Sequence, residues 1–178
     1  MLDKVFPKIH QEGYKFLIIA ILITIVLYFV SHFLGLICLV LTIWVYYFFR
    51  DPERISINDE NYLVSPADGL VLDVSEKSGP KELGLENKNF RKISIFMNVF
   101  DCHVNRSPCA GKISEIFYKP GKFINASLDK SSEENERNYY KIINKQGNEI
   151  VVVQIAGLIA RRIICEASKD QELEQGSR

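Results

Sequence analysis

The sequence predicts a mainly β (α+β) protein, with a compact β sandwich or barrel-like soluble domain behind an N-terminal hydrophobic helical hairpin. Two observations lead to this fold class. No Asp, Glu, Lys or Arg occurs from Phe16 to Phe49, and from Tyr62 onward short β-like runs alternate with turn residues. A length of 178 residues suits one soluble domain with an appendage. We expect the anchoring hairpin at residues 1–54 and the β-rich domain at residues 55–178.

The apolar segment is too long for one straight membrane helix. A helix of that length would run about 51 Å, whereas the hydrocarbon core of a bilayer is about 30 Å thick. Ser31–Gly35 is the one polar, glycine-containing interruption, which predicts two helices of about 16 residues each, joined there. Each helix is short for a full crossing, so the hairpin either spans the bilayer or dips into it. A secretory signal peptide would have an apolar region of only about 7–15 residues and a small-residue cleavage site, and neither fits.

Basic residues flank the apolar segment on both sides and are absent from its tip. Because positive residues stay on the cytoplasmic side of a membrane, both ends of the hairpin are predicted to face the cytoplasm. The flanking residues are Lys4, Lys8, Lys15, Arg50 and Arg54.

The β-like part of the chain consists of five segments. They read LVSPADGLVLDV, RKISIFMNVF, GKISEIFYKPG, YYKIINKQGNEIVVVQIAG and LIARRIICEA. Lys145–Asn148 is typical of a hairpin turn. The polar stretch Asn125–Asn138 is predicted to be a loop or a short helix.

The composition also excludes some classes of partner. Lys and Arg together number 22, as do Asp and Glu, so the net charge is zero, which argues against a nucleic-acid partner. No pair among the four cysteines has CxxC spacing, so no metal site is predicted.

Asp68 lies in the stretch SPADG, between two β-like runs. Proline presets φ and glycine tolerates positive φ, and Asp-Gly is a common turn pair. Taken alone, these residues favour a tight turn over a functional carboxylate.

His103, in NVFDCHVNR, is the only histidine outside the anchor region. Its unperturbed pKa of about 6.5 suits proton transfer near neutral pH. On a strand, Asp101, His103 and Asn105 would share one face, where the carboxylate could orient the imidazole, and Arg106 would point to the other face. A solvent-facing polar strip on an edge strand explains these residues equally well.

Arg161 and Arg162 follow an apolar run. Adjacent guanidinium groups can bind a phosphate or carboxylate bidentately. Ordinary surface charge, or a patch that faces anionic lipid, are the alternatives.

Five separated motifs occur in one order: FFRDPER, SPADG, NVFDCHVNR, YKPGKFINASLDKSSEENER and VVVQIAGLIARRI. Together they resemble the phosphatidylserine decarboxylase proenzymes, in their short bacterial form. The resemblance implies a carboxy-lyase of phospholipid biosynthesis at the cytoplasmic face of the bacterial inner membrane. Such enzymes form phosphatidylethanolamine and CO₂ from phosphatidylserine. Their cofactor is a pyruvoyl group, made when the proenzyme cuts itself at a Gly-Ser bond, and its ketone condenses with the substrate amine and accepts electrons.

The resemblance also implies roles for single residues. Asp68 matches the aspartate assigned to self-processing, and His103 matches a histidine credited with proton transfer beside the pyruvoyl group. Arg106 stands where longer members carry a second histidine, so either His103 serves both steps or the short form processes differently. Arg137 belongs to the motif Asn135-Glu136-Arg137 close to the site. The residues expected to bind substrate are Arg106, Arg137, Arg161 and Arg162.

The C-terminal LEQGSR contains Gly176-Ser177, but the family's processing pair lies in a Phe-Gly-Ser-Arg motif several residues further on. The pyruvoyl-forming serine is therefore expected beyond Arg178. The expected partners are phosphatidylserine, membrane lipid and a smaller pyruvoyl-bearing subunit, and this chain alone is expected to be inactive. The alternative is a non-catalytic, membrane-anchored, lipid-binding β-domain. A lipid hydrolase that uses His103 would need a nucleophile elbow such as G-x-S-x-G, which is absent.

Overall fold

The computed structural model describes residues 6–125 and 131–178, so Lys4 of the predicted basic flank and part of the expected polar loop lie outside the described residues. The chain forms two compact units. The first unit contains residues 1–55 together with two short segments from later in the chain, 67–69 and 97–105. The remaining residues form the second unit. The domain boundary near residue 54 stays a prediction.

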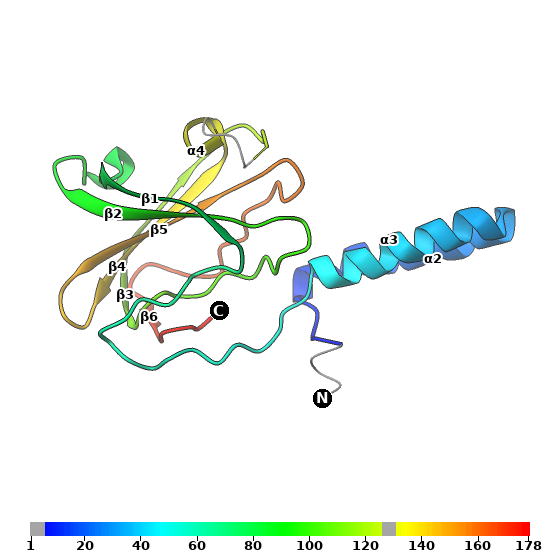
Figure 1. Ribbon diagram of the computed structural model, residues 1–178, viewed down its shortest axis with the longest axis horizontal. Coiled ribbons are helices and arrows are strands. Elements are labelled where there is room, and N and C mark those ends of the chain that lie inside the picture. Colours follow the sequence, from blue (N-terminus) through cyan, green and yellow to red (C-terminus); the bar gives the residue numbers. More distant parts are fainter. Residues whose placement is uncertain (1–5, 126–130) are drawn as a thin grey trace. The chain divides into compact units, whose positions relative to one another are not determined.

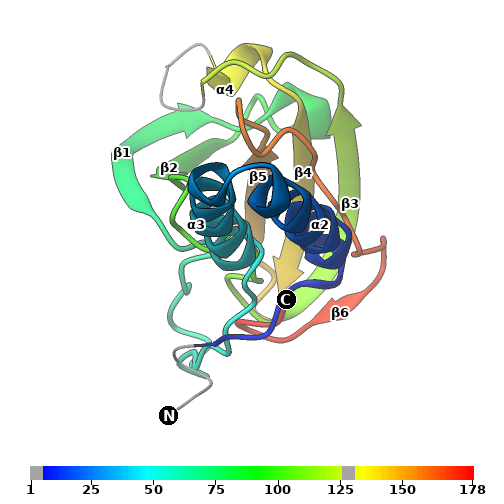
Figure 2. The same ribbon diagram turned by 90° about the vertical axis from the view of Figure 1, so that its right-hand side faces the viewer.

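The first unit is built on the predicted helical hairpin. A short 3-10 helix, η1 (Gln11–Gly13), leads into α2 (Tyr14–Val30), and α3 (His32–Phe48) follows. Figures 1 and 2 show α2 and α3 packed side by side. The extended backbone of Ser31 alone separates the two helices, with φ −157° and ψ 124°. The prediction of two helices is therefore confirmed, and the break is narrower than expected.

Gly35, expected in the break, lies inside α3. A Cβ at this position would come within 2.6 Å of the Tyr28 Cα atom. The glycine is thus required by the close approach of the two helices and not by a turn. Further from the Ser31 break, the hydroxyl oxygens of Thr24 on α2 and Thr42 on α3 lie 2.8 Å apart and share a hydrogen bond. Small residues at the contact and polar bonds between helices are typical of helix pairs in membranes.

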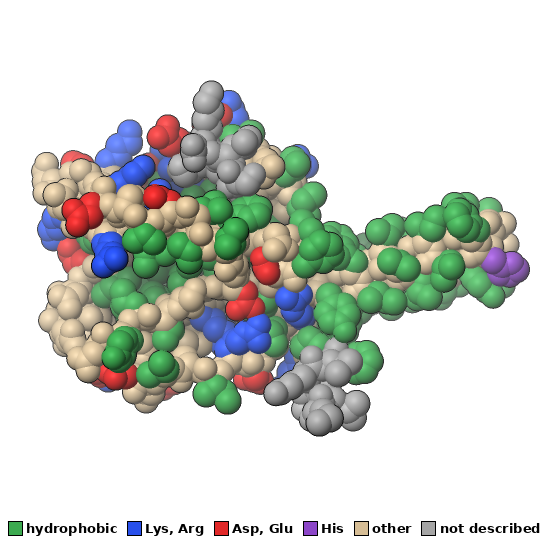
Figure 3. Space-filling model, in the orientation of Figure 1, with side chains coloured by type: hydrophobic (Ala, Val, Ile, Leu, Met, Phe, Trp, Pro, Cys, Tyr) green, Lys and Arg blue, Asp and Glu red, His purple; other side chains and the backbone are tan. Residues whose placement is uncertain are grey.

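The surface of the hairpin is hydrophobic on nearly all sides. Figure 3 shows hydrophobic side chains along both helices, and many of them are about half exposed, such as Ile18, Leu22 and Val26 on α2. Exposure of these apolar side chains to water is unfavourable, by roughly 25 cal/mol for each Å² of apolar surface. The stretch Gln11–Val30 is long and apolar enough to cross a membrane, and His32–Phe48 is a shorter apolar helix.

The second unit contains two antiparallel sheets (Figure 1). One sheet pairs β1 with β2, and the other has the strand order β5-β4-β3-β6. These sheets confirm the predicted fold class. The elements are β1 (Leu70–Ser78), η2 (Lys81–Leu83), β2 (Asn89–Phe96), β3 (Gly111–Lys119), α4 (Ser131–Glu134), β4 (Arg137–Asn144), β5 (Glu149–Ile155) and β6 (Glu172–Leu173).

The core lies on both faces of the four-stranded sheet. Tyr139 and Tyr140 are neighbours on β4 and therefore point to opposite faces. Tyr139 packs with Leu83 and Leu85 from the connection between β1 and β2. Tyr140 packs in a second cluster with Ile113, whose side chain is completely buried. Burial of one such side chain contributes about 1.5–3 kcal/mol.

The turn prediction for residues 145–148 is confirmed. The N–H of Gly147 donates to the carbonyl of Asn144 at 2.9 Å, and Gly147 has φ 83°. The N–H of Asn144 also donates to the carbonyl of Asn148 at 3.0 Å, which pairs the two ends of the turn. The positive φ explains why glycine occupies this position.

Two predicted β-like runs are wrong in part or in full. Residues 158–167 form no strand; the N–H of Gly157 instead donates to the carbonyl of Ala160, which closes a local turn. The run that begins in β2 ends at Phe96, and residues 97–105 are irregular. Apolar content alone cannot distinguish a strand from a loop whose backbone hydrogen bonds are made locally.

Candidate active site

Both residues predicted to be catalytic belong to the first unit. Asp68 lies on segment 67–69 and His103 on segment 97–105. The prediction that His103 lies on a strand is wrong, because residues 97–105 form a loop with an Asn98–Asp101 turn. Alternation along a strand therefore does not orient the imidazole, and the local contacts of the loop do.

The imidazole of His103 is held on its edge and on its face. Nδ1 lies 3.1 Å from the backbone oxygen of Asp101. Because a carbonyl oxygen can only accept, Nδ1 carries the proton and Nε2 keeps its lone pair. The ring also packs on Phe48, with centroids 4.4 Å apart and planes inclined by 31°. This arrangement leaves Nε2 as the atom that can take up a proton.

Burial is the main cause that lowers the pKa of His103. The backbone oxygen and the charge of Asp101 act in the opposite direction, and Arg50 adds to the lowering. His103 is consequently a neutral base at neutral pH.

The Asp101 carboxylate has a different role from the one predicted. Its Oδ2 accepts from the backbone N–H of Asn98 at 2.8 Å and closes the turn before His103. The backbone carbonyl of Asp101, rather than the carboxylate, therefore contacts the ring. A short acidic side chain that caps its own turn is common in loops.

Cys102, next to His103, does not form a nucleophile pair with it. The thiol is buried, and its Sγ donates to the backbone oxygen of Arg50 at 3.4 Å. Burial, and to a lesser degree the charge of Asp68, raises the pKa of this thiol. A protonated, buried thiol is a structural group and not a reactive one.

Asp68 forms an ion pair with Arg54, through Oδ2 and Nη2. Both side chains are partly exposed, 39% for Asp68 and 45% for Arg54. The hydrogen bond to Asp68 raises the pKa of the Arg54 guanidinium. The SPADG stretch forms bends before β1, so the turn interpretation and a functional carboxylate are compatible.

The four arginines predicted to bind substrate belong to the second unit. Arg106 donates from Nη1 to the backbone oxygen of Gly176 at 3.0 Å. Arg137 is buried, donates from Nη2 to the backbone oxygen of Glu133 at 2.7 Å, and lies over the ring of Tyr139. These two guanidinium groups therefore brace the backbone around them.

Asn135, from the same motif as Arg137, is one of the most deeply buried polar residues. Its Oδ1 accepts from the N–H of Ile124 at 2.9 Å, and its Nδ2 donates to the backbone oxygens of Ile124 and Ala156, both at 2.8 Å. The motif thus ties two loops to the start of β4. Arg161, on the segment after Ala156, lies over the Phe123 ring with 5.6 Å to the centroid. Arg161 and Arg162 are exposed.

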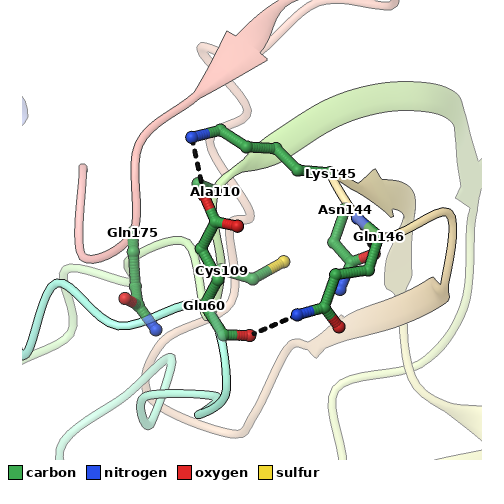
Figure 4. A pocket seen from close by; sticks show the side chains of 7 residues that line it. All are labelled: Glu60, Cys109, Ala110, Asn144, Lys145, Gln146 and Gln175. Carbon is green, nitrogen blue, oxygen red and sulfur yellow. Dashed lines mark hydrogen bonds and ion pairs between the residues drawn. The ribbon is translucent and has the colours of Figure 1, made fainter.

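A small pocket in the second unit is separate from all the predicted site residues. Its rim carries the ion pair of Lys145 with Glu60, at 2.8 Å, and a bond from Gln146 to the Glu60 backbone oxygen (Figure 4). Polar groups that already satisfy one another offer little to a ligand. The lining residues are Glu60, Cys109, Ala110, Asn144, Lys145, Gln146 and Gln175. Within residues 6–125 and 131–178, no group of three or more His, Cys, Asp and Glu side chains is arranged to hold a metal ion.

Two residues of the first unit contact the site residues without having been predicted from the sequence. Phe48 contacts His103, and Arg54 contacts Asp68. Both belong to FFRDPER, whose sequence predicts only basic charge at the end of the hairpin.

Fold and site together define a class: a β-rich protein with an apolar helical hairpin, whose first unit carries a neutral histidine and an ion-paired aspartate. The family model described as "Phosphatidylserine decarboxylase" matches residues 41–178. The chain is 79% identical to the "Phosphatidylserine decarboxylase proenzyme" of Pelagibacter ubique (strain HTCC1062), over all of this chain and 83% of that relative.

Relatives of lower identity carry the same name. The proenzyme of the same name from Ruegeria pomeroyi is 50% identical over all of this chain and 81% of its own length. That of Rickettsia prowazekii is 47% identical over 99% of this chain and 76% of its own length. The chain belongs to the phosphatidylserine decarboxylase family, which is a family of carboxy-lyases.

Proposed function

We propose that this chain forms the larger part of a pyruvoyl-dependent decarboxylase that converts phosphatidylserine into phosphatidylethanolamine and CO₂. The observation that carries the proposal is the 79% identity to a phosphatidylserine decarboxylase proenzyme along the whole chain. The geometry of His103 supports it, because decarboxylation requires a group that can return a proton to carbon.

A pyruvoyl group supplies a ketone that accepts electrons as the carboxylate leaves. The chemistry of the described residues fits such a group. With such a group bound, the unprotonated Nε2 of His103 would accept a proton from the substrate amine. The same atom can then return the proton to the carbon that loses CO₂. Partial burial against Phe48 keeps bulk water away from one face of the ring.

We assign self-processing to Asp68, whose carboxylate is oriented by Arg54. We assign the lipid phosphate to Arg161 and Arg162, since both side chains are exposed and adjacent guanidinium groups suit a phosphate. Arg106 and Arg137 bond to the backbone oxygens of Gly176 and Glu133 within the second unit. A smaller subunit that carries the pyruvoyl group is the proposed partner.

A direct assay tests the activity. A proenzyme of the full length found in the relatives is incubated with phosphatidylserine vesicles, and released CO₂ and the amine product are measured. We expect both products in equal amounts, and loss of activity after treatment with hydroxylamine, which reacts with ketones. Vesicle binding without CO₂ from a processed protein would instead support the alternative, a non-catalytic lipid-binding domain.

We further propose that the hairpin inserts from the cytoplasmic face of a bacterial inner membrane. A single cysteine at Ser56 should then be unreactive to a membrane-impermeant maleimide in intact cells and reactive after lysis. A single cysteine at Lys15 is the matched probe for the other end and should behave in the same way. Labelling of either site from outside would contradict this topology. The background carries no other thiol, through replacement of Cys38, Cys102, Cys109 and Cys165.

A further inference from the structure

The motif FFRDPER ends the apolar hairpin, and its side chains reach the two segments that carry Asp68 and His103. We propose that Phe48–Arg54 is a positioning segment, in which Phe48 fixes the imidazole of His103 and Arg54 fixes the carboxylate of Asp68. This inference rests on the roles proposed above for those two residues. It gives the end of the hairpin a part in the chemistry in addition to attachment to the membrane.

The ion pair of Arg54 with Asp68 contributes little to stability. Pairs between partly exposed side chains contribute only about 0–1 kcal/mol, and these two are 45% and 39% exposed. Orientation is the larger effect, because the hydrogen bond from Arg54 Nη2 to Asp68 Oδ2 favours one direction of the carboxylate. A carboxylate that must take a proton from an attacking group requires that fixed direction.

Phe48 acts on His103 in a similar way. The tilted contact with the Phe48 ring, with centroids 4.4 Å apart, and the bond from Nδ1 to the Asp101 backbone oxygen both restrict rotation of the imidazole. The charged groups near the imidazole are Asp101 on its own loop and Arg50 at the end of the hairpin. Asp101 is engaged by the Asn98 N–H. Phe48 covers one face of the ring and shields it from water.

Backbone contacts strengthen the link between the hairpin and the loop 97–105. Arg50 donates to the backbone oxygens of Tyr47 at 2.7 Å and Phe100 at 2.8 Å. Trp44 Nε1 donates to the backbone oxygen of Val99 at 3.2 Å. Since the loop has no strand partners of its own, these contacts hold it in place. A protein without the hairpin should consequently be impaired even toward substrate dissolved in detergent.

Arg54 is tested through the rate of self-cleavage, followed by gel electrophoresis after cell-free synthesis of the full proenzyme. We expect Arg54→Gln to slow cleavage on the order of 10- to 100-fold, as expected for a misplaced reacting group. Arg54→Lys, which keeps the charge without the planar fork, should restore part of the rate. Arg91→Gln, an exposed arginine on β2, is the matched control and should cleave normally.

The same experiment separates the two proposals. Normal cleavage by Arg54→Gln, together with no cleavage by Asp68→Asn, would overturn the positioning role alone. Normal cleavage by Asp68→Asn would overturn the proposed role of Asp68, and the inference with it.

Phe48 is tested on processed enzyme through the pH dependence of kcat and KM. Phe48→Leu keeps an apolar side chain but removes the ring, so we expect kcat to fall on the order of 10-fold with little change in KM. Greater access of water should raise the pKa of His103 toward its ordinary value. The acid side of the kcat profile should therefore move to higher pH, which a loss of stability alone would not cause.

Phe33→Leu is the matched control, because Phe33 is 71% exposed on α3, and it should leave the profile unchanged. Phe48→Tyr, which keeps the ring, should restore most of the kcat that Phe48→Leu loses. A Phe48→Leu enzyme with unchanged kcat and an unchanged acid side would overturn the role of Phe48, provided that His103→Gln is impaired in the same assay.

Discussion

Asp68→Asn is expected to leave the proenzyme uncleaved. The amide has the shape of the carboxylate but cannot accept a proton from the attacking serine, so the first step of self-processing has no base. The Arg54 ion pair would also be lost, because the amide is uncharged. The uncleaved chain should persist as a single band on a denaturing gel, and CO₂ release should be undetectable.

Asp73→Asn is the matched control for this experiment. Asp73 lies on β1, is exposed and accepts a hydrogen bond from Ser75 at 2.7 Å, so the substitution makes the same change of charge outside the site. It should cleave to completion. Cleavage of Asp68→Asn at the unchanged rate would show that another group serves as the base.

His103→Gln is expected to lower decarboxylation by about 10²–10⁴-fold, the usual contribution of a general acid–base residue. Glutamine fills a similar volume and can hydrogen bond, but it cannot carry a proton from the amine to carbon. Arg106 stands where longer family members have a second histidine, so one histidine, His103, is left for both self-processing and decarboxylation. Activity should therefore be expressed per cleaved molecule. The fraction cleaved then reports separately whether His103 also takes part in self-processing.

His32→Gln at the start of α3 is the control, because the same substitution is made at a histidine remote in sequence from SPADG and NVFDCHVNR. It should retain activity. Near-normal turnover by cleaved His103→Gln would contradict the assignment of His103 and would favour the solvent-facing polar strip.

The decline of wild-type activity at acid pH follows from the same residue, His103. Burial lowers the pKa of His103 in the folded protein, so the unfolded chain binds this proton at higher pH than the folded chain does. The contribution of the buried neutral ring to stability is full above the unfolded pKa of about 6.5 and is lost as the pH falls below it. Activity that requires a neutral His103 should decline on the same side.

Several features of the protein were determined by the sequence alone. The absence of charge from Phe16 to Phe49 and the polar break near Ser31 determined a helical hairpin, because a helix satisfies its backbone hydrogen bonds within one segment in an apolar setting. Turn residues between β-like runs determined a β-rich second part, and Gly147 marked its hairpin turn. The resemblance to the family then pointed to Asp68 and His103.

The tertiary structure decided what surrounds those residues. Residues 97–100 and 158–167 belong to runs with the pattern of strands but form no strand, because backbone pairing depends on partners distant in the chain. Gly35 belongs to helix packing, and the Asp101 carboxylate caps a turn while its carbonyl contacts His103. The pairs Arg54–Asp68 and Phe48–His103 join residues that are 14 or more positions apart. Local pattern carries no information about such contacts, which form only when the end of the hairpin and the two loops fold together.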